Sequence, residues 1–281
     1  MRTREGAVFN ATYIEQSVEA ATLAAASQGF AFVRVRPRAD RDPVGRLINL
    51  TYVIDQGPRV YIERIDIVGN VRTKDKVIRR EFRLVEGDAY NPLLVDRAEK
   101  RIKQLGFFKD VKVQRQPGSA QDRVVIVVNI TEQPTGELSF GAGYSTSEGI
   151  IGDVSITERN LMGNGQFLRL KLGGSADRLQ VDLSFTEPRF LDKNIAAGFD
   201  VFHKELDLTS SSSYKTRRTG FVPRIGFPLS EDLWMSVNYT ISRDEIYDVL
   251  PGASLAVQNA VGTALTSSVG LGLRYDTRNH P

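Results

Sequence analysis

Residues that commonly carry catalysis are scarce in this sequence. Its 281 residues include no cysteine and two histidines, His203 and His280. A thiolate nucleophile is therefore excluded, and the His-x-x-x-His pair typical of zinc sites is absent. No Gly-x-Ser-x-Gly segment is present, so the nucleophile elbow of the α/β-hydrolases is missing too. These absences argue against an enzyme and against a bound metal.

Two glycine pairs, Gly141-x-Gly143 and Gly163-x-Gly165, raise the possibility of a nucleotide site. Both lack the third glycine and the following helix that a dinucleotide site requires, so we interpret them as strand and turn glycines. The carboxylates of Asp182 and Glu187 fall on or beside the polar side of an alternating segment. We expect them to form salt bridges there rather than to act as acid and base. The sequence predicts no catalytic residue and no cofactor.

Charge divides the chain near Pro134. Residues 1–133 carry a net charge of +6 and residues 134–281 a net charge of -3. The basic residues are scattered and no aromatic side chains alternate with them, so nucleic acid is not an expected partner. We expect the basic run Arg97, Lys100, Arg101 and Lys103 to be a solvated helix face. No apolar run is long enough for a transmembrane helix, and the first residues lack the apolar core of a signal peptide, so we expect a missing leader.

The N-terminal half contains a repeat. Gly6-x-x-Phe9-Asn10 matches Gly87-x-x-Tyr90-Asn91 at an offset of 81 residues. Further on, the segment from Leu47 to Gln56 matches the segment from Val124 to Gln133 at an offset of 77. Self-similarity at this period predicts tandem structural modules.

The second copy predicts a β-α-α-β-β order. Residues 60–68 alternate as a strand with one slip, and Gly69-Asn70 is a turn signal. Thr73 is expected to cap a helix over residues 74–82, which Gly87 follows. Asn91-Pro92 opens a second helix that Gly106 ends, and two strands follow. The first copy begins only at the equivalent of the second helix, so we predict an incomplete module over residues 1–57 and a complete one over residues 58–133.

From Glu137 onward the apolar period becomes two. Leu138, Phe140, Ala142 and Tyr144 alternate with Ser139, Gly141 and Gly143, and similar alternation recurs to give eight segments. Their lengths are close to the about 9–11 residues with which a tilted strand crosses a bilayer. Alternation alone fits a soluble sandwich equally well. Short connectors (residues 160–165, 188–193 and 228–232) alternating with longer ones (residues 205–213 and 243–263) favour an outer-membrane barrel. We therefore predict that residues 134–281 form the N-terminal half of an antiparallel transmembrane β-barrel.

These segments together resemble the Omp85 family, most closely its BamA-type outer-membrane assembly factors. The modules resemble POTRA domains, and Gly106-Phe107-Phe108 resembles the step after the second POTRA helix. Residues 158–165 resemble the first periplasmic barrel turn, residues 186–192 the second, and residues 275–278 the end of a mid-barrel strand. The family has up to five POTRA domains and sixteen barrel strands, so the resemblance implies that this chain is a fragment.

The resemblance implies a function in which unfolded outer-membrane proteins are received in the periplasm and inserted into the outer membrane. It implies accessory assembly lipoproteins as partners of the POTRA modules, and contact with outer-membrane lipid. The first strand is the expected pairing site, although small residues there could simply leave space in the lumen. It comprises Leu138, Ser139, Phe140, Gly141, Ala142, Gly143 and Tyr144. The expected structural residues are Gly69, Asn70, Gly87, Gly106, Phe107 and Phe108 in the module, and Asn160, Gly163, Gly165, Pro188 and Phe190 in the barrel turns.

Three alternatives remain open from the sequence. The chain could belong to a TamA-type assembly factor or a two-partner secretion transporter, which the number of upstream POTRA domains would distinguish. It could be a passive porin with soluble modules, which a large constitutive conductance would reveal. It could be a soluble β-rich binding protein, in which case residues 134–281 would fold without detergent.

Overall fold

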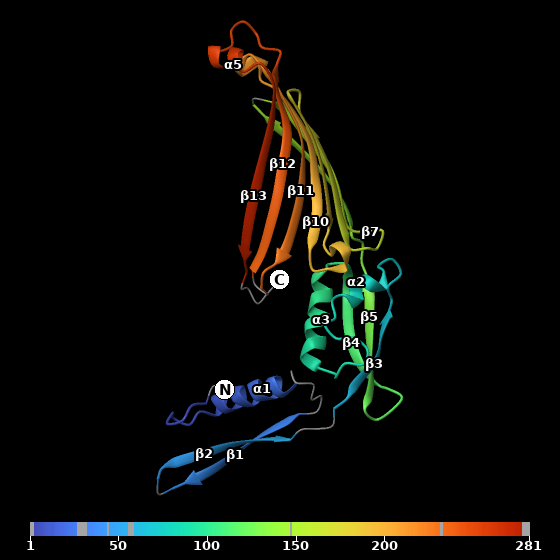
Figure 1. The fold of residues 1–281 in the computed structure, drawn as a ribbon, viewed down its shortest axis with the longest axis vertical. Coiled ribbons are helices and arrows are strands. Elements are labelled where there is room, and N and C mark those ends of the chain that lie inside the picture. The colour runs from blue at the N-terminus through green and yellow to red at the C-terminus, as the bar shows by residue number, and fades with distance from the viewer. Residues whose placement is uncertain are drawn as a thin grey trace. The chain divides into compact units, whose positions relative to one another are not determined.

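The computed structural model describes residues 3–26, 33–43, 45–55, 59–146, 148–230 and 233–276. The chain divides into two compact units, residues 1–133 and residues 134–281. The first contains helices with small sheets, and the second contains one eight-stranded sheet (Figure 1). None of the helices in the described part of the chain is long and apolar enough to span a membrane. Gln56 and His280 lie outside the described residues, as do residues 231–232 and 277–278 of the ranges given above.

The first repeat consists of one helix followed by a strand pair. Helix α1 (Ala11–Ala26) is followed by β1 (Arg34–Asp42) and β2 (Leu47–Asp55), which pair antiparallel along their whole length. The side-chain carbonyl of Asn10 accepts hydrogen bonds from the amides of Thr12 and Tyr13, as an N-cap residue does. The described elements of this copy are one helix and two strands, the last three elements of the β-α-α-β-β order.

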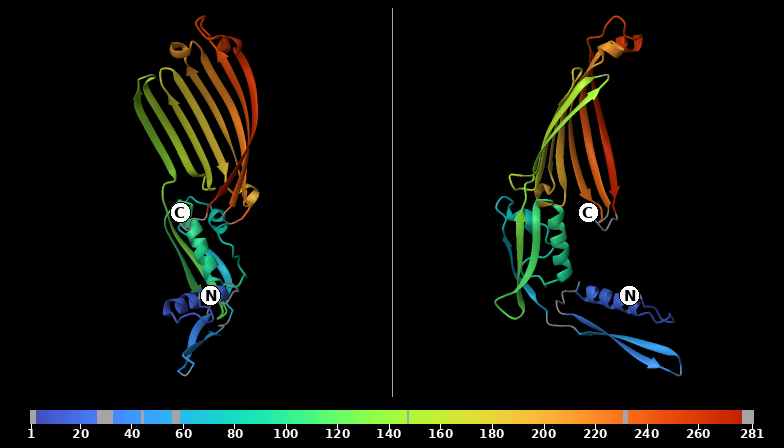
Figure 2. Two further views of the ribbon diagram at one scale, coloured as in Figure 1. Left: turned by 90° about the vertical axis from the view of Figure 1, so that its left-hand side faces the viewer. Right: turned by 180° about the vertical axis from the view of Figure 1, so that it is seen from behind.

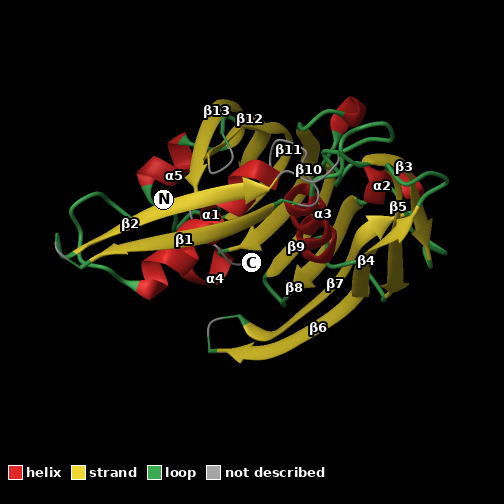
Figure 3. Ribbon diagram, turned by 90° about the horizontal axis from the view of Figure 1, so that it is seen from below, coloured by secondary structure: helices red, strands yellow, loops and turns green. Residues whose placement is uncertain are grey.

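The second repeat has the predicted β-α-α-β-β order. It comprises β3 (Tyr61–Val68), α2 (Asp75–Arg79), α3 (Pro92–Gln104), β4 (Phe108–Pro117) and β5 (Arg123–Glu132). The sheet order is β3-β5-β4, with β3 parallel and β4 antiparallel to the central β5. The slip in the sequence alternation is a register shift between Ile62 and Arg64. Both helices pack on one face of this sheet (Figure 3), around Ile62, Ile65, Val77, Ile78, Val95, Ala98, Ile102, Ile126 and Val128.

The two helices of this repeat begin in different ways. Asn91 caps α3, because its side-chain oxygen accepts from the amides of Leu93 and Leu94 at 3.0 and 3.3 Å, and Pro92 follows it. The prediction for α2 was wrong: the N-cap is Lys74 rather than Thr73, no side chain caps the helix, and the helix ends at Arg79. The Thr73 amide instead donates to Glu132 at the end of β5. A tertiary contact therefore holds the loop before α2, and the helix begins without a side-chain cap.

The second unit is a meander of eight antiparallel strands, as predicted (Figure 2). Each strand pairs with its neighbours in sequence. The strands are β6 (Gly136–Ser145), β7 (Gly149–Leu161), β8 (Gln166–Gly174), β9 (Arg178–Glu187), β10 (Ala196–Asp207), β11 (Lys215–Pro228), β12 (Leu233–Tyr247) and β13 (Gly262–Tyr275). Short helical segments lie in three connections: η1 (Phe190–Asp192), α4 (Thr209–Ser212) and α5 (Leu255–Asn259).

The connector lengths differ from those expected. At the end of the sheet opposite Gly136, only three residues separate β6 from β7, and three separate β8 from β9. The last two connections on that side are longer, but β12 continues to Tyr247 and so shortens the connector expected over residues 243–263. The predicted alternation of short and long loops is therefore wrong for the first four strands. The two connectors expected to be long, over residues 205–213 and 243–263, are shorter than expected because their outer polar residues belong to β10 and β12.

Candidate functional site: the first strand and the two faces of the sheet

One face of the eight-stranded sheet is apolar and not buried. A single hydrogen-bond row crosses all eight strands on this face: Leu138, Ile156, Leu170, Leu183, Val201, Phe221, Ile241 and Ser267. Leu138 is 57% exposed and Ile156 55%. Among the described residues of this unit, Ala253 is the sole buried hydrophobic side chain. The apolar face therefore does not form a water-excluding core, and a lipid environment would satisfy it.

The apolar band drifts steadily against the hydrogen-bond rows. On β6 it begins at Leu138, which lies on the row just described. Phe221 on β11 and Ser267 on β13 lie on the same row, but the corresponding border of the band lies further along these strands. It reaches Phe227, six residues past Phe221, and Tyr275, eight residues past Ser267. A band of constant height crosses the register in this way only when the strands are tilted, as they are in a barrel wall.

On the opposite, polar face, glycines lie beside larger side chains of the neighbouring strand. Gly220 pairs with Phe202, and a Cβ on this glycine would come within 2.4 Å of the ring. Gly226 lies in the same way beneath the ring of Trp234. Arg224 reaches across β10 to Asp200, Thr186 Oγ1 and a backbone carbonyl. Large side chains on this face therefore lie flat along the sheet.

Strand β6 ends the sheet. In the described part of the chain it pairs with β7 alone, so its other edge presents backbone donors and acceptors without a strand partner. Leu138, Phe140 and Tyr144 lie on the apolar face, with Phe140 73% and Tyr144 77% exposed. On the polar face the Ser139 hydroxyl donates to Glu137 at 3.0 Å. The structure thus places all seven residues of the expected pairing strand on one open edge.

Gly141 and Gly143 on this strand have different surroundings. Gly141 pairs with Asp153, and a Cβ on Gly141 would lie 2.5 Å from the Asp153 carboxylate. Gly173 flanks Asp153 on the other side, so the carboxylate lies between two glycines. Nothing lies within 4 Å of a Cβ built on Gly143. Gly141 therefore has a packing role, whereas Gly143 lowers strand propensity without any steric need.

The segment before β6 is anchored at the end of β7, beside the turn that follows β7. Glu158 accepts hydrogen bonds from the Thr135 hydroxyl at 2.5 Å and from the Asn160 amide at 2.8 Å. The buried side-chain oxygen of Asn160 accepts from the Gly165 amide at 2.7 Å. Gly163 and Gly165 both have φ of +71°, which an L side chain rarely adopts. The three expected residues of this turn thus form one hydrogen-bonded unit.

The second expected turn connects β9 to β10. Pro188 follows the last residue of β9, and the Phe190 amide donates to the Ile195 carbonyl at 2.8 Å, which closes the turn. Phe190 begins η1 and its side chain is 44% exposed. Both residues form the connection and contribute no reactive group.

The expected module residues also have structural roles. Gly69 has φ of +96°, and a Cβ there would lie 2.1 Å from the Ile130 carbonyl oxygen. The Asn70 amide group donates to Asp75 at 2.5 Å. Gly87, also at φ +96°, donates its amide to Ile62, and Gly106 at φ +71° follows α3. The rings of Phe107 and Phe108 meet edge to face with centroids 6.1 Å apart, both in the core.

The basic run on α3 is not one solvated face. Arg101 donates to the Glu81 carbonyl and lies 3.8 Å from the Glu81 carboxylate, which is itself buried. Lys103 pairs with Glu99 one turn earlier at 2.6 Å. The expectation was wrong for Arg101 because the sequence did not show that Glu81 lies against it. Within the described residues, no cluster of histidine and carboxylate side chains could hold a metal ion.

Glu132, which sequence reasoning missed, connects the end of β5 to the loop before α2. Its carboxylate accepts from the amides of Val71 at 3.2 Å, Arg72 at 2.9 Å and Thr73 at 2.7 Å. Burial acts to raise the pKa of Glu132, but these three hydrogen bonds and one from the Thr73 side chain outweigh burial and hold the pKa below its ordinary value of 4.5. No local signal could have revealed it, because the partners lie about 60 residues apart in sequence.

Comparison with known proteins identifies the family. The POTRA family, described as a surface antigen variable number repeat, matches residues 1–57 and 60–133, and the Omp85 superfamily domain matches residues 160–281. The chain belongs to the Omp85 superfamily. It is 34% identical over 97% of its length to the outer membrane protein assembly factor BamA of Neorickettsia risticii. It is 30% identical over 73% of its length to BamA of Neisseria meningitidis.

Solved structures of the superfamily share the fold of this Omp85 chain. BamA from Haemophilus ducreyi lacking POTRA domains 1–3 matches 99% of the chain with a TM-score of 0.73 at 24% identity, and the match covers 56% of that structure. CdiB from Escherichia coli matches 94% of the chain and 50% of that structure, with a TM-score of 0.54 at 15% identity. The chain spans 37% of the Neorickettsia relative and 26% of the Neisseria relative.

The family and the fold together give the location. This Omp85 chain is an outer-membrane protein with POTRA modules in the periplasm and strands in the membrane. The exposed apolar band and its drift across the strands agree with that location. The predicted fold class, POTRA modules followed by a partial antiparallel barrel, is confirmed.

Proposed function

We propose that this chain receives unfolded outer-membrane proteins in the periplasm and inserts them into the outer membrane. In this proposal residues 1–57 and 58–133 act as POTRA modules, and residues 134–281 act as the N-terminal half of the barrel. The matched family ranges and the division of the chain after Gln133 support these boundaries. The assembly-factor names of the relatives support the role.

The similarity to BamA assembly factors over nearly the whole chain carries this proposal, and we place the pairing on β6, an edge strand of the described sheet. An extended segment can add to an open sheet edge through backbone hydrogen bonds, with little demand on its sequence. Residues 138–144 would supply those bonds, while Leu138, Phe140 and Tyr144 keep lipid on one side of the new strand pair. A substrate strand would then enter the membrane with its backbone groups already paired, which lipid requires.

The second repeat offers a further edge for extended segments. The Gly87 amide donates to the Ile62 carbonyl of β3, and the Tyr90 amide donates to the Val60 carbonyl just before β3, so both cover part of its outer edge. Among the described strands, β4 pairs only with β5, so its edge is the more open. We propose unfolded substrates or accessory assembly lipoproteins as occupants of the POTRA modules. The role needs no catalytic residue, no cofactor and no nucleic acid.

Disulfide trapping tests the pairing strand directly. The chain has no natural cysteine, so Ser139→Cys and Gly143→Cys each provide a single reactive thiol. Gly143 is preferable to Gly141 because a side chain there meets nothing within 4 Å. Ser184→Cys, on the same face of the central strand β9, is the matched control. We expect both β6 variants to trap a stalled substrate strand carrying cysteine, and the control not to. Trapping no greater than at Ser184 would contradict the proposal.

A second variant tests whether the strand must be weak. Gly143→Val adds a β-branched side chain without a clash, so it should stiffen the edge and slow insertion in a reconstituted assay. If insertion is unchanged, Gly143 only leaves space on the lumen face.

A further inference from the structure

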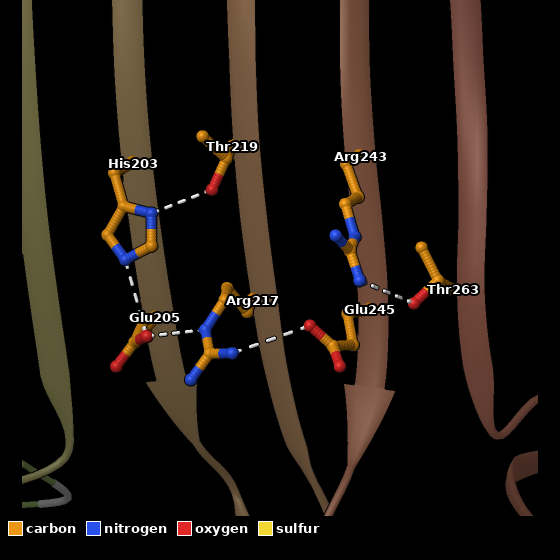
Figure 4. A network of polar contacts seen from close by, with 7 residues as sticks. All are labelled: His203, Glu205, Arg217, Thr219, Arg243, Glu245 and Thr263. Carbon is orange, nitrogen blue, oxygen red and sulfur yellow. Dashed lines mark hydrogen bonds and ion pairs between the residues drawn. The ribbon is translucent and has the colours of Figure 1, made fainter.

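A group of polar side chains lies on the otherwise apolar face of the sheet. It crosses β10, β11, β12 and β13, as Figure 4 shows, and we call it the outward ladder. Its members are His203, Glu205, Arg217, Thr219, Arg243, Glu245 and Thr263. They occupy alternate positions in continuous strands, so they share a face with Val201, Phe221 and Ile241.

The change from apolar to polar occurs at one level on three strands. Val201, Phe221 and Ile241 lie on one hydrogen-bond row, and the next row on this face holds His203, Thr219 and Arg243. The row after that holds Glu205, Arg217, Glu245 and Thr263. Charged side chains on a lipid-facing surface are tolerated near the membrane interface and not at its centre. The hydrocarbon layer must therefore end at this level on β10–β12.

Most charges of the ladder are paired with one another. Arg217 Nε lies 2.6 Å from Glu205, and its Nη1 lies 3.4 Å from Glu245, so one guanidinium joins carboxylates of two strands. The same guanidinium carbon lies 4.8 Å from the centre of the Tyr247 ring. His203 Nδ1 lies 2.7 Å from the Thr219 hydroxyl. These contacts keep Arg217 and both carboxylates occupied within the protein.

Arg243 is the exception. Its side chain is exposed, and among the described residues its guanidinium donates only to the Thr263 hydroxyl, at 3.4 Å. It forms no ion pair with any carboxylate in the described ranges, whereas Lys215, two rows further along this face, is matched by Asp207 and Asp248. Arg243 lies directly beyond Ile241 and so at the edge of the apolar band. The ladder therefore presents one cation with free donors at the level of the lipid head groups.

We propose that the outward ladder binds the phosphate of a lipid head group, with Arg243 as the contact. The planar guanidinium matches two phosphate oxygens and is always charged. The aliphatic stem of Arg243 can lie along the apolar band while its head reaches the interface. This inference rests on the location of the strands in lipid and not on the proposed insertion activity.

Lipid retention by the purified protein tests the contact. Native mass spectrometry would compare adducts of phosphatidylglycerol with those of diacylglycerol, which has the same chains and no phosphate. We expect selective retention of phosphatidylglycerol, a reduction of threefold or more in Arg243→Gln, and an intermediate reduction in Arg243→Lys, which keeps the charge but cannot match two phosphate oxygens at once. Arg218→Gln, on the polar face where Arg218 pairs with Asp244, is the matched control and should retain lipid normally. Equal retention by Arg243→Gln and the unaltered protein would overturn the proposal.

A second measurement locates the ladder without altering Arg243. In a Trp234→Phe background, Tyr239→Trp and Tyr247→Trp each place one indole on the face of β12 that carries the ladder. Tyr239 lies on the apolar side of the ladder, and Tyr247 lies past its other end. We expect lipids brominated in the acyl chain to quench Tyr239→Trp several-fold more strongly than Tyr247→Trp. Equally strong quenching of the two indoles would place the ladder within the hydrocarbon layer and contradict a head-group site. Neither outcome depends on a substrate insertion assay.

Discussion

Glu132 gives the sharpest prediction for the second repeat. Its carboxylate accepts three backbone amides, so Glu132→Gln replaces one acceptor oxygen with an NH2 group that cannot accept. Hydrogen bonds to a charged acceptor contribute about 1.5–3 kcal/mol, and solvent screening of this half-buried group reduces that figure. We expect a loss of about 2 kcal/mol in the local opening free energy of residues 71–73, which corresponds to about 30-fold faster amide exchange.

The same contact predicts a pH dependence. Because the folded pKa of Glu132 is lowered, its stabilising contribution is fully present above the ordinary pKa of 4.5. The contribution is lost as the pH falls through the lowered folded value. The Glu132→Gln variant has no such group, so its protection at residues 71–73 should not change over this range.

Hydrogen exchange of the intact protein, followed by mass spectrometry of the peptide over residues 68–76, measures both effects. Glu63→Gln is a suitable control, because Glu63 accepts the Ser119 amide at 2.7 Å and does not contact residues 71–73. Unchanged exchange at residues 71–73 in Glu132→Gln at neutral pH would refute the reasoning, as would equal effects of both variants.

Three further predictions concern the positions of glycines and a helix cap. Gly69→Ala should unfold the second repeat, as measured by circular dichroism, because its Cβ would meet a backbone carbonyl at 2.1 Å. Gly87→Ala has the same φ of +96° but nothing within 4 Å, so it should lower the free energy of unfolding by only about 1–2 kcal/mol. Asn91→Ala removes two capping hydrogen bonds and should lower stability by about 1 kcal/mol in urea titrations, an effect that Asn91→Ser should largely restore. Gly220→Val should clash with the Phe202 ring and destabilise the sheet by about 1–3 kcal/mol, seen as a lower temperature of heat-modified migration on gels.

Several features of the fold could be predicted from the sequence because they depend on local chemistry. The Asn91-Pro92 pair specifies a helix start by itself, since one side chain caps and the next fixes φ. Alternation specified eight strands and their two faces, because successive strand side chains point to opposite sides. The limits of β10 and β12 could not be predicted, because charged residues of the outward ladder resemble loop residues until their cross-strand partners are known.

The sequence by itself determined the module order, the strand periodicity and the family, since each is encoded by residue types at short spacings. The tertiary structure decided what depends on distant partners. It showed that Thr73 does not cap α2 and that its amide donates to Glu132 instead. It also showed that Gly141 leaves room for the Asp153 side chain, whereas no atom lies within 4 Å of a Cβ built on Gly143. Finally, the register between strands brought Arg217 between two carboxylates and left Arg243 without one, because which charges meet across a sheet depends on strand pairing and not on sequence spacing.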